Sequence, residues 1–271
     1  MKDGISNIKN SSFILFMTTE LIKQLRDETG ISVMQCKKAL EEAGGDVEKA
    51  RIILKKKSGV AASKKADREL ASGFIASAAG EGKVAIVTLF CETDFVAKNE
   101  DFIKVAKSIA EKAITEGESA KESSSDTVNE LIQKIGENIK IGDIKIAEGN
   151  AGSYVHNGQI AAVVNLKEKN DELARDIAMH ITAMRPAFMN ESDIDETAKE
   201  NAKSIFSKEV EEQAKDKPEE MKTQILNGKL ASFFKDQVLM KQSFVKDPSK
   251  TIEQLVKEAN NEIVSYTLEQ I

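Results

Sequence analysis

The chain contains an internal repeat, and this repeat restricts the folds that it can adopt. The first copy consists, in order, of strand-like residues 72–75, a turn at 80–82, a strand at 83–89 and a helix at 102–114. The second copy consists of residues 152–155, a turn at 157–158, a strand at 159–166 and a helix at 173–184. Each copy has the pattern of a β-hairpin followed by a helix. We therefore predict an α+β fold with two related halves, in each of which helices cover a small antiparallel sheet.

The two copies differ in the connection between strand and helix. The matched residues are Leu89 with Asn165, at an offset of 76, and Phe102 with Leu173, at an offset of 71. The first copy therefore has five extra residues, within a connector at 91–99 that includes Asp94 and Phe95. Because the second copy makes the same connection without them, two interpretations of Phe95 are open. It either folds back onto its own sheet or projects as an aromatic wedge for a partner, since loops on a rigid scaffold commonly carry binding residues.

Three short helices precede the repeat. Their apolar spacing places them at about 18–28, 33–42 and 47–56, with glycine breaks after the first two. Asp46 is expected to cap the third helix. We assign residues 17–57 to a three-helix module, which is either a small stability module or a partner-docking module of the ubiquitin-associated type. The basic residues 58–71 predict a linker to the core.

The core is predicted to divide into halves at 72–151 and 152–271. Between the two copies we expect a polar loop at 116–126, a helix at 128–138 and a strand at 139–147. Two charged helical stretches on either side of Pro218, at about 192–230, predict an antiparallel hairpin. Its narrow apolar stripe pairs either internally or with a second copy of the chain, which would form a homodimer. Thr251 and Gln254 predict a capping box for the last helix, before a strand at 262–268.

Composition excludes several classes of protein. The 39 Lys and Arg against 45 Asp and Glu give a net charge of −6, which disfavours sequence-independent binding of nucleic acid. Cys36 and Cys91 are the two cysteines, which fits a reducing, cytoplasmic compartment, and with two histidines they exclude a multi-cysteine zinc site. No apolar run approaches the roughly 20 residues of a membrane helix. Residues 1–16 match neither a secretory signal nor a transit peptide, and we expect a poorly ordered extension there.

Motifs that would indicate enzyme chemistry are absent from the sequence. No phosphate-binding glycine motif or nucleophile elbow occurs, so we expect no direct nucleotide binding and no cofactor. His180 recurs at helical spacing among apolar residues, which favours a role in the core. His156 lies on the loop of the second hairpin and could donate or accept outward. A nucleophilic Cys91 would need a base that the sequence does not place, so an enzyme is the least favoured class.

A series of short motifs is similar to those of the translation elongation factor Ts family. In chain order they are LRDETG at 25–30, MQCKKAL at 34–40, TDFVA at 93–97, KIGENI at 134–139, GSY with His156 at 152–156, MH at 179–180, FV at 244–245 and PSKT at 248–251. The resemblance covers about residues 17–271. One departure is Ile31-Ser32-Val33, where the family usually has a Gly and a second Met, which implies a slightly altered contact there.

The resemblance implies a guanine-nucleotide exchange factor for elongation factor Tu, active in translation and protein biosynthesis and not an enzyme. The implied partner-binding residues are Asp94, Phe95, Thr93, Val96, Ile135, Gly136, His156, Val33 and Met34. Asp94 and Phe95 would enter the partner's G domain near its Mg²⁺ site and displace that metal, with Phe95 as the wedge.

The other implied contacts are distributed over the chain. Ile135, Gly136 and His156 would bear on the same G domain, while Val33 and Met34 would dock on one of its helices. The rival class is an adaptor, in which the three-helix module binds a peptide or a ubiquitin-like partner and the core only supports it. An adaptor would not accelerate nucleotide release, which separates the two interpretations.

Overall fold

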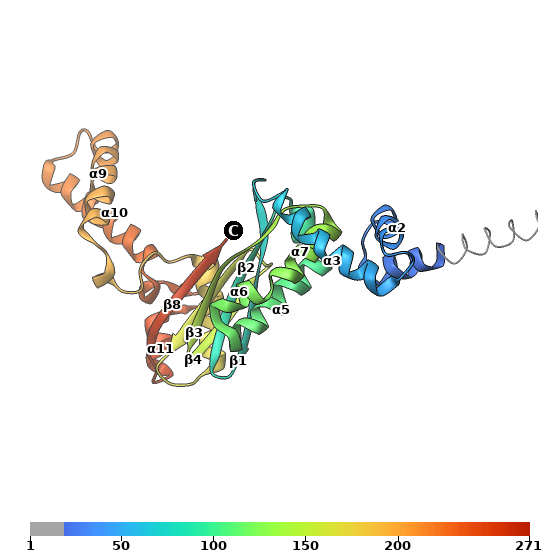
Figure 1. The fold of residues 1–271 in the computed structure, drawn as a ribbon. Helices are drawn as coiled ribbons and strands as arrows, with labels where there is room; N and C mark the ends of the chain where they lie inside the picture. The colour runs from blue at the N-terminus through green and yellow to red at the C-terminus, as the bar shows by residue number, and fades with distance from the viewer. Residues whose placement is uncertain (1–18) are drawn as a thin grey trace, which may run out of the picture. The chain divides into compact units, whose positions relative to one another are not determined.

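The computed structural model describes residues 19–271, and the expectation for residues 1–16 lies outside this range. The described chain forms two compact units. The first contains residues 19–78, 85–146 and Ile271, and the second contains residues 79–84 and 147–270. Helices and small antiparallel sheets make up both units, which confirms the predicted α+β class (Figure 1).

The helical module opens the first unit. It consists of a helix over residues 19–29, α2 (Val33–Glu42) and α3 (Val47–Ser63). Asp46 caps α3 as predicted, because its carboxylate accepts a hydrogen bond from the backbone N–H of Lys49 at 3.0 Å. Leu25, Cys36 and Leu40 form the centre of a small core shared by the three helices.

The predicted linker at 58–71 is partly wrong, because α3 continues through its first residues to Ser63. The extension packs along helix α7 (Ser125–Ile135), where Ser58 is buried and Ala62 contacts the core of the unit. Gly59 costs about 1 kcal/mol of helix propensity, and the burial of this face outweighs it. Sequence periodicity missed the extension because its partner lies almost 70 residues away in the sequence.

The first sheet has the order β1-β2-β3 and is built as the repeat predicts. Its strands are β1 (Ser72–Gly80), β2 (Lys83–Cys91) and β3 (Ile139–Glu148). Helices α5 (Glu100–Glu116) and α7 lie along the sheet (Figure 1), and Phe102 and Ile109 of α5 are buried in the shared core. The connector between β2 and α5 contains the short helix α4 (Asp94–Ala97).

The region between α5 and β3 differs from the prediction at two points. The expected polar loop contains η1 (Gly117–Ser119) and α6 (Ala120–Ser123), because Ala120 is fully buried in the core and orders this segment. The next helix ends at Ile135 and not at residue 138. Gly136 ends it in the left-handed conformation with φ +93°, the usual reason for a glycine at a helix C-terminus.

The second sheet has the order β4-β5-β8 and repeats the arrangement of the first. Its strands are β4 (Asn150–His156), β5 (Ile160–Leu166) and β8 (Ile263–Gln270), and α8 (Asp171–Met184) packs on β4 and β5. His156 pairs with Ile160 across the hairpin turn. Asn157 and Gly158 both have positive φ, which is the turn type that the Asn-Gly pair predicts.

The remaining elements of the second unit confirm the predicted helical hairpin. They are η2 (Glu191–Asp193), α9 (Glu196–Gln213), α10 (Glu219–Gln237), η3 (Leu239–Lys241), β6 (Ser243–Phe244), β7 (Asp247–Thr251) and α11 (Ile252–Glu258). Helices α9 and α10 run side by side and extend away from the sheet of this unit (Figure 1), and α10 has no buried residue. The capping box of Thr251 and Gln254 is present, whereas the β6-β7 ladder was not predicted.

Candidate functional site

The connector between β2 and α5 presents one large aromatic side chain to solvent. Helix α4 is capped by Thr93, whose hydroxyl accepts a hydrogen bond from the N–H of Val96 at 3.4 Å. Val96 and Ala97 face the core, and Val96 is only 8% exposed, whereas Phe95 is 82% exposed. The interpretation in which Phe95 folds back onto its own sheet is therefore wrong.

A carboxylate from a distant turn holds the base of this connector. Glu137 Oε2 accepts hydrogen bonds from the backbone N–H groups of Glu92 and Thr93, both at 3.1 Å. Its other oxygen, Oε1, accepts one from the Thr93 hydroxyl at 2.7 Å. Hydrogen bonds to an ionised acceptor are stronger than neutral ones, and three of them converge here. The backbone leading into α4 is therefore fixed to the end of α7.

A second carboxylate completes the attachment in the opposite direction. Glu92 accepts a hydrogen bond from the backbone N–H of Asn138 at 2.5 Å and one from Arg68 at 3.2 Å. The Asn138 N–H, and after it Arg68, lower the pKa of the Glu92 carboxyl. The Asn138 side chain in turn donates to the Arg68 carbonyl oxygen at 2.9 Å. We call the set of Glu92, Glu137 and Asn138 the carboxylate clamp.

The clamp brings together two of the predicted site segments. Ile135 and Gly136 directly precede Glu137, so they lie beside the connector that carries Asp94 and Phe95. Sequence reasoning missed the three clamp residues themselves. The available signal was a carboxylate directly after a strand and another directly after a glycine C-cap, where backbone N–H groups lack partners.

Asp94 and Cys91, two titratable residues close to Phe95 in the sequence, differ in their protonation behaviour. Lys98 Nζ donates to Asp94 at 2.8 Å and lowers the pKa of this carboxyl, which is therefore ionised at neutral pH. The Cys91 thiol is buried, donates to the Thr93 carbonyl at 3.2 Å, and has its pKa raised to about 11 by burial and by Glu137. A thiol with this pKa is protonated at neutral pH, so Cys91 does not supply a reactive thiolate.

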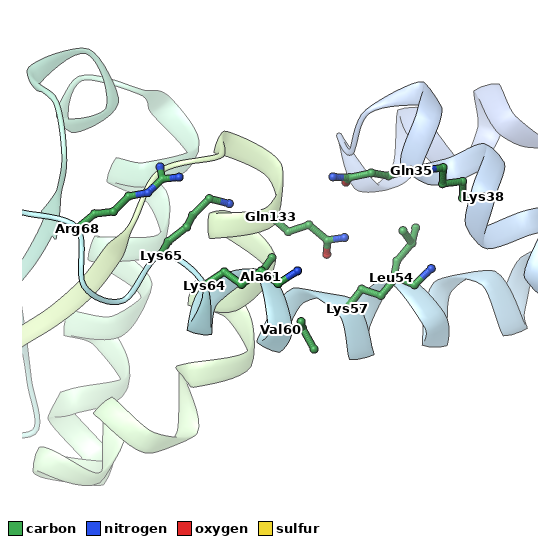
Figure 2. A pocket seen from close by; sticks show the side chains of 10 residues that line it. All are labelled: Gln35, Lys38, Leu54, Lys57, Val60, Ala61, Lys64, Lys65, Arg68 and Gln133. Atoms are coloured by element: carbon green, nitrogen blue, oxygen red, sulfur yellow. The ribbon is translucent and has the colours of Figure 1, made fainter.

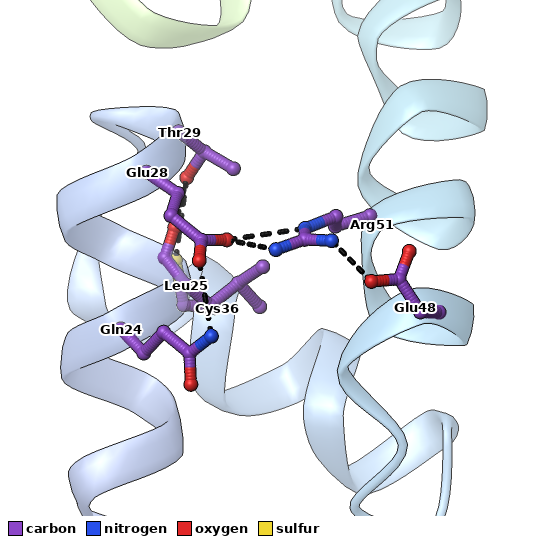
Figure 3. Close-up of polar contacts among 7 residues, drawn as sticks. All are labelled: Gln24, Leu25, Glu28, Thr29, Cys36, Glu48 and Arg51. Carbon is purple, nitrogen blue, oxygen red and sulfur yellow. Dashed lines mark hydrogen bonds and ion pairs between the residues drawn. The ribbon is translucent and has the colours of Figure 1, made fainter.

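The helical module contributes a second exposed group of predicted site residues. Val33 and Met34, at the start of α2, are 51% and 63% exposed. Figure 3 shows the polar contacts that join the first helix to α3 in this module. Arg51 on α3 binds Glu28 and Glu48, and Thr29 donates to the Leu25 carbonyl at 2.6 Å.

The two histidines occupy contrasting environments in the second unit. His156 is exposed at the end of β4, with its ring nitrogens 3.3 Å from the Tyr154 hydroxyl and 3.3 Å from the Asn157 side chain. His180 is fully buried, as predicted, and burial lowers its pKa.

His180 connects two loops through a defined set of contacts. Gln242 donates to the Asp236 carbonyl at 2.6 Å, which leaves its side-chain oxygen to accept from His180 Nε2 at 2.9 Å. The neutral ring then has a lone pair on Nδ1, which accepts the N–H of Val245 at 3.4 Å.

Residues 19–271 contain neither a cluster of metal ligands nor a membrane-spanning helix. No group of three or more His, Cys, Asp or Glu side chains in this range could hold a metal ion. Over the same residues, no helix has the length and apolar character needed to cross a membrane.

Known proteins are similar to this chain over most of its length. The family described as "Elongation factor TS" matches residues 92–271. An elongation factor Ts of Pseudomonas syringae pv. tomato is 39% identical over 93% of this chain and 89% of its own length. That of a Hydrogenobaculum species is 37% identical over 90% of this chain and 94% of its own length. That of Teredinibacter turnerae is 38% identical over 93% of this chain and 89% of its own length.

Proposed function

The chain belongs to the elongation factor Ts family, and from this premise we propose that it is a guanine-nucleotide exchange factor for elongation factor Tu. In this role it binds the GTPase during translation elongation and promotes release of GDP, so that GTP can bind. The observation that carries the proposal is the exposure of Phe95 on a short helix whose base is fixed by the carboxylate clamp.

The mechanism follows from how a GTPase holds its nucleotide. Backbone amides of the phosphate loop and a Mg²⁺ ion bind the phosphates, and release is slow while this arrangement is intact. Phe95 enters near that site and is buried only when the site is distorted. Burial of one phenylalanine contributes about 1.5 to 3 kcal/mol, and each tenfold change in affinity requires about 1.4 kcal/mol. Burial of the Phe95 ring therefore accounts for a 10- to 100-fold change in nucleotide affinity at about 1.4 kcal/mol per tenfold. The wider interface supplies the remaining free energy of coupling.

The clamp supports this mechanism by reducing the entropy lost on binding. A free connector would have to be ordered when the partner binds, at about 1 to 2 kcal/mol for each residue whose backbone becomes fixed. The contacts of Glu137 with residues 92 and 93 exist in the free protein, so this cost is met during folding. Thr93 and Val96 belong to this support, and the burial of Val96 does not fit a side-chain contact with the partner.

The other predicted contacts keep their assigned roles. Ile135 and Gly136 lie beside the connector and bear on the G domain together with Phe95. His156 contacts the same domain from the second unit, and Val33 and Met34 dock on one of its helices. Asp94, which is ionised, acts on the metal site through its charge, weakened by Lys98 and by solvent. No covalent bond changes in this mechanism, so the proposal includes no catalytic residue and no cofactor.

A nucleotide-release assay tests the proposal. Elongation factor Tu loaded with fluorescent mant-GDP is mixed with the protein and excess GDP, and the decay of fluorescence is followed. The exchange factor accelerates the decay in proportion to its concentration until the partner is saturated. Binding to the partner without acceleration would support the adaptor instead, and no binding at all would contradict both.

A further inference from the structure

A hollow of about 470 Å³ lies between α2, α3 and α7, where the helical module meets the rest of the first unit. Figure 2 shows the side chains that surround it. Five of its ten lining residues are cationic and none is acidic; the cationic residues are Lys38, Lys57, Lys64, Lys65 and Arg68. A chain with net charge −6 therefore concentrates positive charge at this place.

Three of these cations are not engaged in a hydrogen bond or ion pair within the described part of the chain, although Lys65 is near enough to Glu92 to help lower the pKa of that carboxyl. Lys57 binds Glu42 at 2.6 Å and Arg68 binds Glu92 at 3.2 Å. The ammonium groups of Lys38, Lys64 and Lys65 form no hydrogen bond or ion pair with any described residue. Three like charges at one hollow repel one another, and an anionic occupant would relieve this repulsion.

The floor of the hollow is apolar and elongated. Leu54, Val60 and Ala61 of α3 form it, and Val60 is 57% exposed. The lining extends along α3 from Leu54 to Lys64, the residue that follows its last turn, a distance of about 15 Å at 1.5 Å per residue. A single small anion would occupy only a fraction of this length. The floor suits a chain of residues that carries aliphatic side chains between its charges.

The lining also discriminates between classes of polyanion. Single-stranded nucleic acid is held by aromatic side chains on which its bases stack, and no aromatic residue lines the hollow. Arg68, the one guanidinium that could stack on a base, is engaged by Glu92. Carboxylates need only the flexible point charges that lysines provide.

From these observations we propose that the hollow is a docking groove for an acidic polypeptide segment in which carboxylates alternate with aliphatic side chains. The groove is a surface additional to Val33, Met34 and the Phe95 connector, and it binds its segment independently of nucleotide exchange.

Fluorescence anisotropy with a labelled peptide of repeated Glu-Glu-Leu tests the groove on the full chain. The peptide is about nine residues long, so its extended length of about 30 Å exceeds that of the groove. The triple variant Lys38→Gln, Lys64→Gln, Lys65→Gln should weaken binding about tenfold, since each exposed charge contributes about twofold. Val60→Ser should weaken it about threefold, because it removes part of the apolar floor.

The matched control removes the same charge elsewhere in the first unit. Lys107→Gln, Lys121→Gln, Lys140→Gln changes three exposed lysines outside the groove and should alter binding less than twofold. Equal loss in both triple variants would overturn the proposal, because it would indicate attraction by overall charge. Stronger competition by polyuridylate than by unlabelled peptide would overturn it in favour of nucleic acid. A tenfold gain in affinity on deletion of residues 1–16 would also overturn it, by assigning the groove to the chain's own terminus.

Discussion

At the scale of single residues, the unusual feature is that the most exposed of the large apolar side chains in residues 19–271 lies in a connector held by several hydrogen bonds. Phe95 is exposed while its neighbours Val96 and Ala97 are buried and its base is bound by Glu137. Exposed phenylalanine lowers solubility and gains nothing for the isolated fold. A rigid scaffold that keeps such a ring in water is typical of a residue whose burial occurs in a complex.

Replacement of Phe95 by alanine separates binding from stability. Because the ring is exposed, Phe95→Ala should change the free energy of unfolding by about 1 kcal/mol or less, well below the 3 to 5 kcal/mol of a core phenylalanine. At saturating concentrations of the variant, GDP release from elongation factor Tu should slow about tenfold or more. Thermal melting and the mant-GDP assay measure the two effects. Ile205→Ala, which alters an exposed aliphatic residue on α9, is the control and should exchange at the normal rate.

Glu137 is expected to act through Phe95. Glu137→Ala leaves two backbone N–H groups and a hydroxyl without their acceptor, and should cost about 1 to 3 kcal/mol of stability. It should also slow exchange, whereas Glu137→Gln, which retains an acceptor, should do both to a smaller extent. In a Phe95→Ala background, Glu137→Ala should still destabilise the protein but have no further effect on exchange. An undiminished exchange defect in that background would show that Glu137 acts by another route.

His180 makes stability depend on pH in a predictable direction. Its pKa is lowered in the folded state from 6.5, so the unfolded chain takes up the proton first as pH falls. The stabilisation is complete above about pH 6.5 and is lost as pH decreases towards the folded-state value. Urea unfolding at several pH values should show a smaller decline for His180→Gln than for the wild type. His156→Gln, which changes the exposed histidine, should keep the wild-type decline in stability with falling pH. An equal decline in the His180→Gln and His156→Gln variants would exclude His180 as its cause.

At the scale of elements, the sequence predicted what local patterns and the repeat encode. Both β-hairpins, their following helices, the helical hairpin and the Thr251 cap appear where the patterns place them. The errors fall where a distant contact decides the outcome. Helix α3 is longer because it packs along α7, and α6 forms because Ala120 is buried.

The candidate site also combines features that local sequence patterns indicate with features that depend on distant contacts. The repeat identified the connector with Asp94 and Phe95 as an addition to the first copy, but it left open whether Phe95 is exposed, which the structure decides. The clamp could not be predicted, because Glu137 and Asn138 reach residues 44 to 46 positions away in the sequence. Periodicity carries no information on a contact of that separation.

The helical hairpin is predicted to be separable from the rest of its unit. Helix α10 has no buried residue, and α9 buries only Ala202 and Val210. Replacing residues 200–233 by a short Gly-Ser linker should therefore change the stability of the remaining protein by about 1 kcal/mol or less. The linker leaves Asp236 and Val238, which contact the rest of the unit, in place. Chemical unfolding measures the effect, and collapse of the truncated protein would show that the hairpin is part of the core.

At the scale of the whole molecule, exchange is a coupling between two ligands of the same partner. If the protein weakens GDP binding by some ratio, GDP must weaken binding of the protein by the same ratio. We expect the affinity of the protein for elongation factor Tu, measured by calorimetry with and without GDP, to change by the factor found for GDP with and without the protein. For Phe95→Ala both factors should shrink together. Unequal factors would indicate that one measurement includes a second binding event.

The separation of the clamp residues along the chain also has a consequence for synthesis. The backbone at 92 and 93 is held by Glu137, and Glu92 is held by Asn138. A nascent chain that has emerged only as far as α5 contains Phe95 but not Glu137, whose carboxylate fixes the connector. The connector that carries Phe95 therefore becomes rigid only after about half of the polypeptide has left the ribosome. Until then the growing chain presents this connector to the partner without a fixed conformation.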